Sequence, residues 1–193
     1  ARAVLFRPDG ALGANAAAPP ALLPGAFNPV HTGHVALAAA AGRLLNAPVA
    51  FELSVKNADK LPLSVEDVRI RLAGFQWRAP VWLTRAPTFV AKAELFPNCV
   101  FVIGVDTAAR IVAPRYYVDS EVELANALGV IRARGCRFLV AGRTDQAGRF
   151  LTLADVNVPE AGRGLFEPIP QDSFHVDISS TQLRQCDARG SGP

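Results

Sequence analysis

The sequence is poor in sulfur: it has no methionine and only three cysteines among 193 residues. Cys99, Cys136 and Cys186 are widely spaced, odd in number and without the Cys/His spacing of a zinc site. The cysteine pattern therefore excludes a zinc ribbon and a disulfide framework as the basis of the fold. A reduced, cytoplasmic setting is the default expectation.

Long hydrophobic runs and a strong charge excess are also lacking. The most apolar stretch, Val35 to Leu45, is interrupted by Arg43 and is far shorter than the ~20 residues of a membrane span. No apolar region typical of a secretory signal opens the chain. The net charge of +3 is mild and scattered, so we expect neither a membrane nor a nucleic acid as a partner. Nearly all the positive charge is arginine, which favours bidentate contacts with phosphate groups.

Half of the residues are hydrophobic and 19% are charged, which is typical of a globular domain. From Leu22 onward, strand and helix patterns alternate, and this alternation predicts an α/β fold with a doubly wound parallel sheet. Strands are expected at Leu22–Phe27, Pro48–Val55, Val81–Thr84, Asn98–Gly104 and Cys136–Ala141, and helices at Gly33–Asn46, from Ser64, at Thr88–Phe96, Glu121–Arg134 and Ser179–Asp187. Residues 142–173 are expected to be irregular.

The first twenty residues differ in composition from the rest. They contain one apolar run, Ala3 to Phe6, followed by a Gly/Ala/Pro stretch that ends at Pro19-Pro20. We interpret residues 1–20 as an N-terminal arm or linker and residues 21–193 as the catalytic domain. Such an arm is compatible with a longer, multidomain chain.

The first strand runs directly into a motif with two histidines, Gly25-Ala26-Phe27-Asn28-Pro29-Val30-His31-Thr32-Gly33-His34. Ligands of doubly wound sheets bind beyond the carboxyl ends of the strands. The free N–H groups of a helix N-terminus bind anions, and Gly33 allows the backbone to approach a ligand closely. His31 and His34 can both donate hydrogen bonds to phosphate oxygens. Two histidines at this spacing, after a strand and at a helix start, favour a catalytic phosphate site over a pair of capping residues.

The last predicted helix opens with a second candidate motif, Ile178-Ser179-Ser180-Thr181-Gln182-Leu183-Arg184. Ser179 or Ser180 is a natural N-cap, and Arg184 follows at a spacing that places it on the same side of the helix. Taken alone, this pattern is typical of an ordinary capped helix. Together with the histidine motif, it predicts a second phosphate-binding turn.

These two motifs, GxFxPxHxGH and ISSTxxR, resemble those of the nucleotidylyltransferase superfamily, and the resemblance spans Leu22 to Asp187. The ISSTxxR form is most similar to nicotinamide or nicotinate mononucleotide adenylyltransferases. Pantetheine-phosphate adenylyltransferases tend to end this motif with a lysine, and class I aminoacyl-tRNA synthetases need a lysine-rich motif in a longer chain. A related cytidylyltransferase-like branch, sometimes behind a CinA-like domain, stays open. The resemblance implies a Rossmann-like fold of the HUP type.

The resemblance also implies roles for individual residues. The donor nucleotide would lie against Gly25, Ala26, Phe27 and Gly33, with Ile178 to Thr181 on its phosphates and His31, His34 and Arg184 as catalytic residues. Gly104-Val105-Asp106 is similar to the family's GxD, whose acid contacts a ribose hydroxyl, and Arg143 matches an arginine near the nucleotide. The acceptor would be contacted by Asn57, Lys60, Thr88 and a tryptophan, Trp77 or Trp82, of which we assign Trp82. The loop after Asn57 lacks the family's usual proline.

The expected reaction is the transfer of AMP from ATP to a mononucleotide phosphate, with release of pyrophosphate. Mg²⁺ would be carried mainly by phosphate oxygens and water. No dedicated metal-binding carboxylates are visible in the sequence. A cytidylyltransferase, an adenylyltransferase with another acceptor, an ATPase-like activity without transfer and a nucleotide-binding domain without turnover stay open as alternatives. Small-molecule nucleotides are the expected partners, and the resemblance also allows a homo-oligomer.

Overall fold

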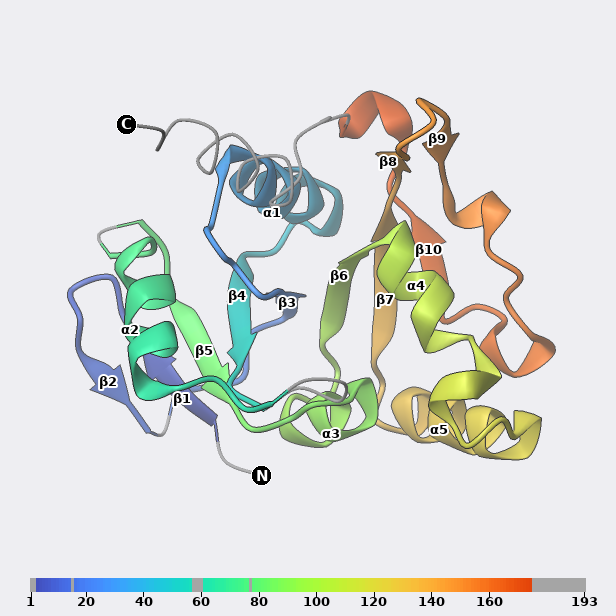
Figure 1. Cartoon of the computed structure of the whole chain (residues 1–193), viewed down its shortest axis with the longest axis horizontal. Helices are drawn as coiled ribbons and strands as arrows, with labels where there is room; N and C mark the ends of the chain where they lie inside the picture. Colours follow the sequence, from blue (N-terminus) through green and yellow to red (C-terminus); the bar gives the residue numbers. More distant parts are fainter. Residues whose placement is uncertain (1–2, 15, 57–60, 77, 175–193) are drawn as a thin grey trace, which may run out of the picture.

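A sheet of eight strands runs through the described part of this computed structural model, which comprises residues 3–14, 16–56, 61–76 and 78–174 (Figure 1). The strand order is β10-β7-β6-β3-β4-β5-β1-β2. The strands are β1 (Ala3–Phe6), β2 (Leu12–Gly13), β3 (Ala21–Pro24), β4 (Val49–Ser54), β5 (Val81–Thr84), β6 (Val100–Gly104), β7 (Arg137–Ala141) and β10 (Phe166–Pro168). The strands from β10 to β5 are parallel, and β1 and β2 are antiparallel to their neighbours.

Helices cover both faces of this sheet. The α-helices are α1 (Thr32–Leu45), α2 (Val65–Ala73), α3 (Phe89–Leu95), α4 (Val105–Ile111) and α5 (Glu121–Ala133). The 3-10 helices are η1 (Pro114–Tyr116), η2 (Leu153–Asp155), η3 (Glu160–Gly162) and η4 (Gln171–Ser173). A separate antiparallel pair, β8 (Arg143–Thr144) and β9 (Phe150–Leu151), follows β7. None of the helices described here is both apolar enough and long enough to span a membrane.

The central strands are apolar on both faces because each face has its own hydrophobic core. Leu22 and Phe101 contribute to a core that includes residues of α3, α4 and α5. Leu23 and Val102, the next residues along these strands, contribute to a second core with residues of α1 and α2. Because alternate side chains of a strand point to opposite faces, these apolar runs are buried on both faces of the sheet. The predicted doubly wound parallel sheet is confirmed.

The chain reverses its direction of travel across the sheet between β3 and β6. From β3 it proceeds through α1 to β4 and through α2 to β5, away from β6. It then returns through α3 to β6, which lies on the other side of β3, and continues outward to β7 and β10. The crevice at such a reversal is where open α/β sheets bind their ligands.

The N-terminal segment, which we interpreted as an arm or linker, contributes two strands to the sheet. β1 pairs along the whole length of β5, with Leu5 opposite Trp82, and β2 pairs with β1. β1 and β2 therefore extend the sheet at its β5 edge. The apolar run Ala3 to Phe6 covers a strand edge that would otherwise be open, but a run of four residues carries too little periodicity to reveal its partner.

Several short elements were not predicted, among them α4 and β10. α4 begins directly after β6, and β10 adds a parallel strand within the region expected to be irregular. α2, by contrast, begins as predicted: Ser64 Oγ accepts from the Asp67 N–H at 3.0 Å, and the Asp67 carboxylate accepts from the Ser64 N–H at 3.2 Å. The helix expected at Ser179–Asp187 lies outside the described residues.

Candidate active site

The turn between β3 and α1 is shaped by an aromatic side chain. Phe27 has a positive φ of 45° and is 1% exposed. Its ring packs edge to face against the rings of Phe51, Phe75 and His34, with centroid distances of 5.5, 5.0 and 5.0 Å. A Cβ on Gly25 would lie 2.6 Å from this ring, so a side chain at residue 25 would displace it. Arg71 of α2 fixes the same turn by donating to the Ala26 carbonyl at 2.8 Å. Arg71 was not predicted to contact this turn.

The two histidines of the motif stack at the first turn of α1. His31 is the N-cap residue, with extended backbone, and its N–H donates to His34 Nδ1 at 3.2 Å. The two ring centroids are 3.7 Å apart and the rings are tilted by 31°. Both side chains are half-buried, and Gly33 between them is buried. The structure thus brings His31, Gly33 and His34 together, as predicted.

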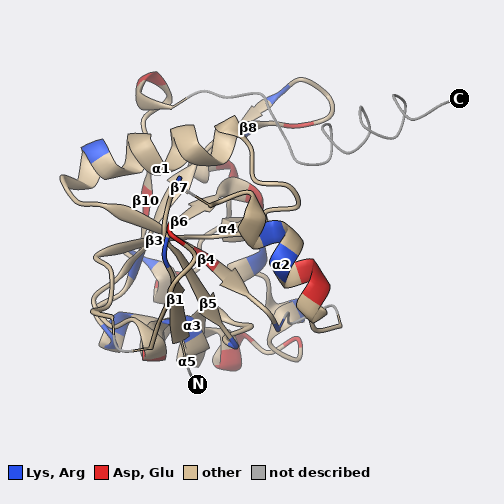
Figure 2. Ribbon diagram, turned by 90° about the vertical axis from the view of Figure 1, so that its left-hand side faces the viewer, with Lys and Arg blue, Asp and Glu red and all other residues tan. Residues whose placement is uncertain are grey.

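The N-terminus of α1 is electrostatically suited to an anion. This helix of 14 residues has no acidic residue in its first turn, and its one charged residue is Arg43, in the last turn (Figure 2). The positive end of the helix dipole is therefore not offset within the helix. Two imidazoles lie at this end, and the N–H groups of a helix N-terminus are the arrangement that binds phosphate groups.

Both imidazoles are neutral at neutral pH. Burial lowers the pKa of His34 from 6.5 to about 4, and the neighbouring His31 lowers it further in the same direction. Burial also lowers the pKa of His31. Because His34 Nδ1 accepts the His31 N–H, the single proton of neutral His34 lies on Nε2. His34 can therefore donate one hydrogen bond to a ligand without carrying a charge of its own.

The depressed pKa of His34 predicts an acid-sensitive fold. Between pH 6.5 and about 4 the unfolded chain binds a proton at this residue that the folded chain does not, so stability falls as the pH falls through this window. We expect His34→Gln to remove about 1–3 kcal/mol of this acid-dependent loss, a range that allows for the partial exposure of the ring. Urea unfolding at pH 7 and pH 4.5 measures it. An equal loss in both proteins would contradict the pKa assignment.

A second group of predicted residues lies at the carboxyl ends of β6 and β7. Gly104 is the N-cap residue of α4, and a Cβ there would meet nothing within 4 Å. Asp106, in the first turn of α4, forms an ion pair with Arg143 of β8, and both side chains are about half exposed. β3 and β6 are neighbours on the two sides of the reversal point of the sheet. The histidines follow β3 at the start of α1, and Asp106 follows β6 in the first turn of α4; both helices are labelled in Figure 1.

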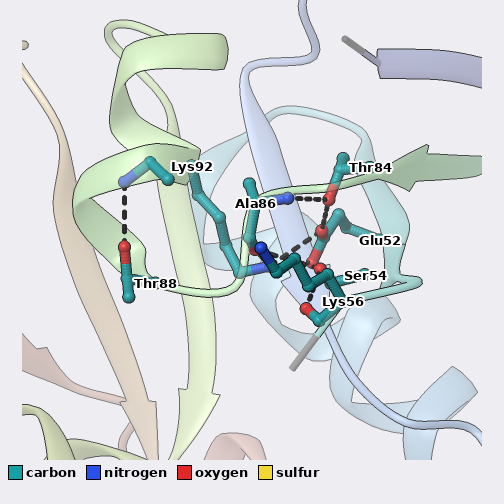
Figure 3. A network of polar contacts seen from close by, with 8 residues as sticks. Glu52, Ser54, Lys56, Thr84, Ala86, Thr88 and Lys92 are labelled. Carbon is teal, nitrogen blue, oxygen red and sulfur yellow. Dashed lines mark hydrogen bonds and ion pairs between the residues drawn. The ribbon is translucent and has the colours of Figure 1, made fainter. Parts of the chain in front are cut away.

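A buried ionic network beside this site was not predicted. Glu52 of β4 is 1% exposed, and both of its carboxylate oxygens accept from Lys92 Nζ of α3 at 2.8 Å (Figure 3). Thr84 of β5 also donates to Glu52, and Lys92 Nζ donates to the Ala86 carbonyl at 2.9 Å. The sequence signal that could have indicated this network was Glu52, the one charged residue in the largely apolar strand Val49–Ser54.

Of the residues predicted to contact the acceptor, two lie within the described ranges, and they differ in exposure. Thr88 is exposed at the carboxyl side of β5, where its Oγ1 caps α3 by accepting from the Ala91 N–H at 3.3 Å. Trp82, which we assigned to the acceptor, is 5% exposed within the core. Its ring packs edge to face on that of Phe96, with the two centroids 5.2 Å apart. An indole buried to this extent has little surface for a ligand to contact.

The other predicted site residues lie outside the part of the chain that the structure describes: Asn57, Lys60, Ile178, Ser179, Ser180, Thr181 and Arg184. Among the described residues, no group of three or more His, Cys, Asp or Glu side chains could hold a metal ion. Two cavities of about 280 and 360 Å³ lie at α5 and the 153–166 segment, and no predicted site residue lines either of them.

A model of the cytidylyltransferase-like family matches residues 22–186. The matched stretch begins in β3, includes both histidines, Asp106 and Arg143, and extends beyond Arg184. No curated protein matches the sequence.

Proposed function

Because this chain belongs to the cytidylyltransferase-like family, a family of nucleotidylyltransferases, we propose that it transfers AMP from ATP to the phosphate of nicotinamide or nicotinate mononucleotide. One observation carries the proposal: two neutral, stacked histidines surround the uncompensated N-terminus of α1 at the reversal point of the sheet. The ISSTxxR motif, Ile178 to Arg184, favours the pyridine mononucleotide acceptor.

In the proposed reaction, an acceptor phosphate oxygen attacks the α-phosphorus of ATP. The new P–O bond forms as the bond from the α-phosphorus to the oxygen bridging it to the β-phosphorus breaks, and pyrophosphate leaves with that electron pair. No protein nucleophile is needed, so catalysis consists of positioning the reactants and stabilising charge. His34 Nε2–H and His31 would donate to oxygens of the reacting phosphate, together with the N–H groups of the first turn of α1.

The remaining groups would orient the two nucleotides. Asp106 would accept from a ribose hydroxyl of the donor, and Arg143, its ion-pair partner, would lie near the donor's phosphates. Ser179, Ser180, Thr181 and Arg184 would hold the β- and γ-phosphates, which become the leaving group. Asn57, Lys60 and Thr88 would contact the acceptor. Mg²⁺ would enter as part of the substrate, Mg·ATP, and would reduce the negative charge of the phosphates.

A second donor is favoured by the family match itself, since the matching family is cytidylyltransferase-like. CTP would occupy the same site, with its ribose on Asp106 and its phosphates at the N-terminus of α1. The two donors differ only in the base, and both carry the ribose and triphosphate that this site would bind. The assay of the proposal must therefore compare ATP and CTP directly.

The proposal is tested by pyrophosphate release from Mg·ATP and Mg·CTP with a panel of acceptors. The panel contains nicotinamide mononucleotide, nicotinate mononucleotide, phosphopantetheine and flavin mononucleotide. We expect release only with ATP and a pyridine mononucleotide. Release with CTP or another acceptor would replace the proposed substrates, and release without any acceptor would indicate nucleotide hydrolysis. Binding of ATP without release under any condition would refute turnover.

A further inference from the structure

The turn that leads to the two histidines is anchored at both ends by main-chain bonds. At the sheet, the Gly25 N–H donates to the Glu52 carbonyl of β4 at 3.0 Å, and in α1 the His34 N–H donates to the His31 carbonyl at 3.0 Å. Between these ends lies Phe27, whose φ of 45° is in the left-handed region that a bulky residue rarely adopts. A backbone in this region persists only where the surrounding structure holds it.

The C-terminal end of α2 packs on this turn. Three residues, spaced so that they share one face of a helical turn, make the contacts: Arg71, Gly74 and Phe75. The first donates from Nη1 to the Ala26 carbonyl at 2.8 Å, and the third packs its ring edge to face on that of Phe27, with centroids 5.0 Å apart. A Cβ on the glycine would lie 2.7 Å from Val30 Cγ1, so α2 ends in close contact with the residue before the first histidine.

Of these three contacts, the one made by Arg71 sets the orientation of the backbone. Ring and van der Waals contacts fix how closely two groups lie, but they leave a peptide plane free to rotate. The Ala26 carbonyl lies in the peptide plane that ends at the N–Cα bond of Phe27, and rotation about that bond is the φ of Phe27. A guanidinium that holds this oxygen through a charge-assisted bond therefore also restrains the positive φ.

The φ of Phe27 in turn determines where its ring lies relative to α1. This ring packs edge to face on the imidazole of His34, with centroids 5.0 Å apart and an angle of 78° between the two planes. The same imidazole stacks on that of His31, with centroids 3.7 Å apart. The position of His34 therefore depends on the peptide between Ala26 and Phe27, and the side chain that holds this peptide is Arg71.

We propose that Arg71 is a positioning residue for nucleotidyl transfer: by holding the Ala26 carbonyl, it fixes the turn that presents His34 to the reacting phosphate. This inference rests on the proposed function. The competing role is direct contact with a phosphate of the donor, since a guanidinium has more donors than the one that Ala26 accepts. Loss of a positioning residue lowers kcat, whereas loss of a phosphate contact made equally in the ground state raises KM for ATP.

The test uses the full chain and substitutions of two arginines of α2. Arg71→Met removes the charge and the donors but keeps an unbranched side chain with a similar preference for the helix. Arg71→Lys keeps the charge and a donor but has a shorter reach and no planar fork. Arg69→Met is the matched control, because Arg69 is an exposed residue of the same helix and its substitution changes the net charge equally.

For Arg71→Met we expect kcat to fall by about 10–10²-fold, with KM for ATP and for the acceptor within about twofold of the wild-type values. In a protein that already carries His34→Ala, the same substitution should cost less than about threefold, because the group that it positions is absent. Arg71→Lys should recover part of kcat, and Arg69→Met should leave kcat unchanged. A tenfold rise in KM for ATP at wild-type kcat overturns the proposal, and so do losses that multiply in full in the double variant.

An NMR measurement separates this proposal from the proposed function. The imidazole resonances of His34, assigned by their absence from the His34→Gln protein, are sensitive to the neighbouring ring of Phe27. At pH 7 they should move in Arg71→Met and stay in place in Arg69→Met. If the wild-type protein releases no pyrophosphate with any acceptor, the proposed function fails, and Arg71 is judged on these resonances alone. Resonances that Arg71→Met leaves unchanged overturn the positioning role.

Discussion

His34→Ala is expected to reduce kcat for nucleotidyl transfer by roughly 10²–10³-fold, the usual cost of removing one preorganised donor from a developing charge. His34 is placed for this role by its Nδ1, which accepts the His31 N–H at 3.2 Å and so leaves the proton on Nε2. The low pKa, about 4, keeps this donor neutral before ATP binds. The negative charge of bound phosphates would raise that pKa and strengthen the hydrogen bond.

The loss should be catalytic rather than structural. His34 is half-buried and packs edge to face on Phe27 at 5.0 Å, so its removal costs about 1 kcal/mol of stability through one hydrogen bond and a small contact. Steady-state kcat at saturating substrates and the melting temperature are the measurements. His34→Gln, which keeps a neutral donor, is the control and should recover part of the rate. A His34→Ala protein with wild-type kcat would refute the assignment of this motif.

The sheet and the histidine pair were predictable because their signals are local. A continuous apolar run such as Cys99 to Ile103 predicts a strand buried on both faces, and Ser64 with Asp67 predicts the start of α2. His31 and His34 are three residues apart at the start of a helix, so the spacing alone places them side by side. In each case the information lies within a few residues of the chain.

The pairs that join distant segments were not predictable as pairs. Asp106 and Arg143 were each predicted near the nucleotide, but they are 37 positions apart, and their ion pair depends on β6 and β7 being neighbours. Glu52 and Lys92 are 40 positions apart on different elements. A charge in an apolar strand indicates that a partner exists, but the partner's identity follows only from the packing of α3 on β4 and β5.

Short elements were missed for a related reason. β10 has three residues and α4 has seven, which is too few for a hydrophobic period to stand out. β1 has four residues and was interpreted as part of an arm or linker. Each of them is stabilised by tertiary contacts, β1 by pairing with β5 and β10 by pairing with β7, and such contacts leave little trace in the local sequence.

Trp82→Leu is expected to lower the free energy of unfolding by about 3 kcal/mol and to leave KM for the acceptor unchanged. Trp82 is 5% exposed, and the centroid of its ring lies 5.2 Å from that of Phe96. Its strand, β5, is paired on both sides, with Leu5 of β1 and Glu52 of β4 opposite Trp82. Leucine fills part of the volume but leaves a cavity in the core. Urea unfolding and acceptor titration in the pyrophosphate assay give the two quantities.

The same substitution decides which tryptophan, if either, serves the acceptor. A ring that stacks on a pyridine base contributes to binding and little to the core, so its loss would raise KM for the acceptor without lowering stability. Trp82 is only 5% exposed. Its loss is therefore predicted to lower stability and to leave KM for the acceptor unchanged. Trp77→Leu is the matched variant, since Trp77 is the other tryptophan of the chain. If Trp82→Leu raised KM for the acceptor tenfold at unchanged stability, the core assignment of Trp82 would be wrong and the original expectation of stacking would stand.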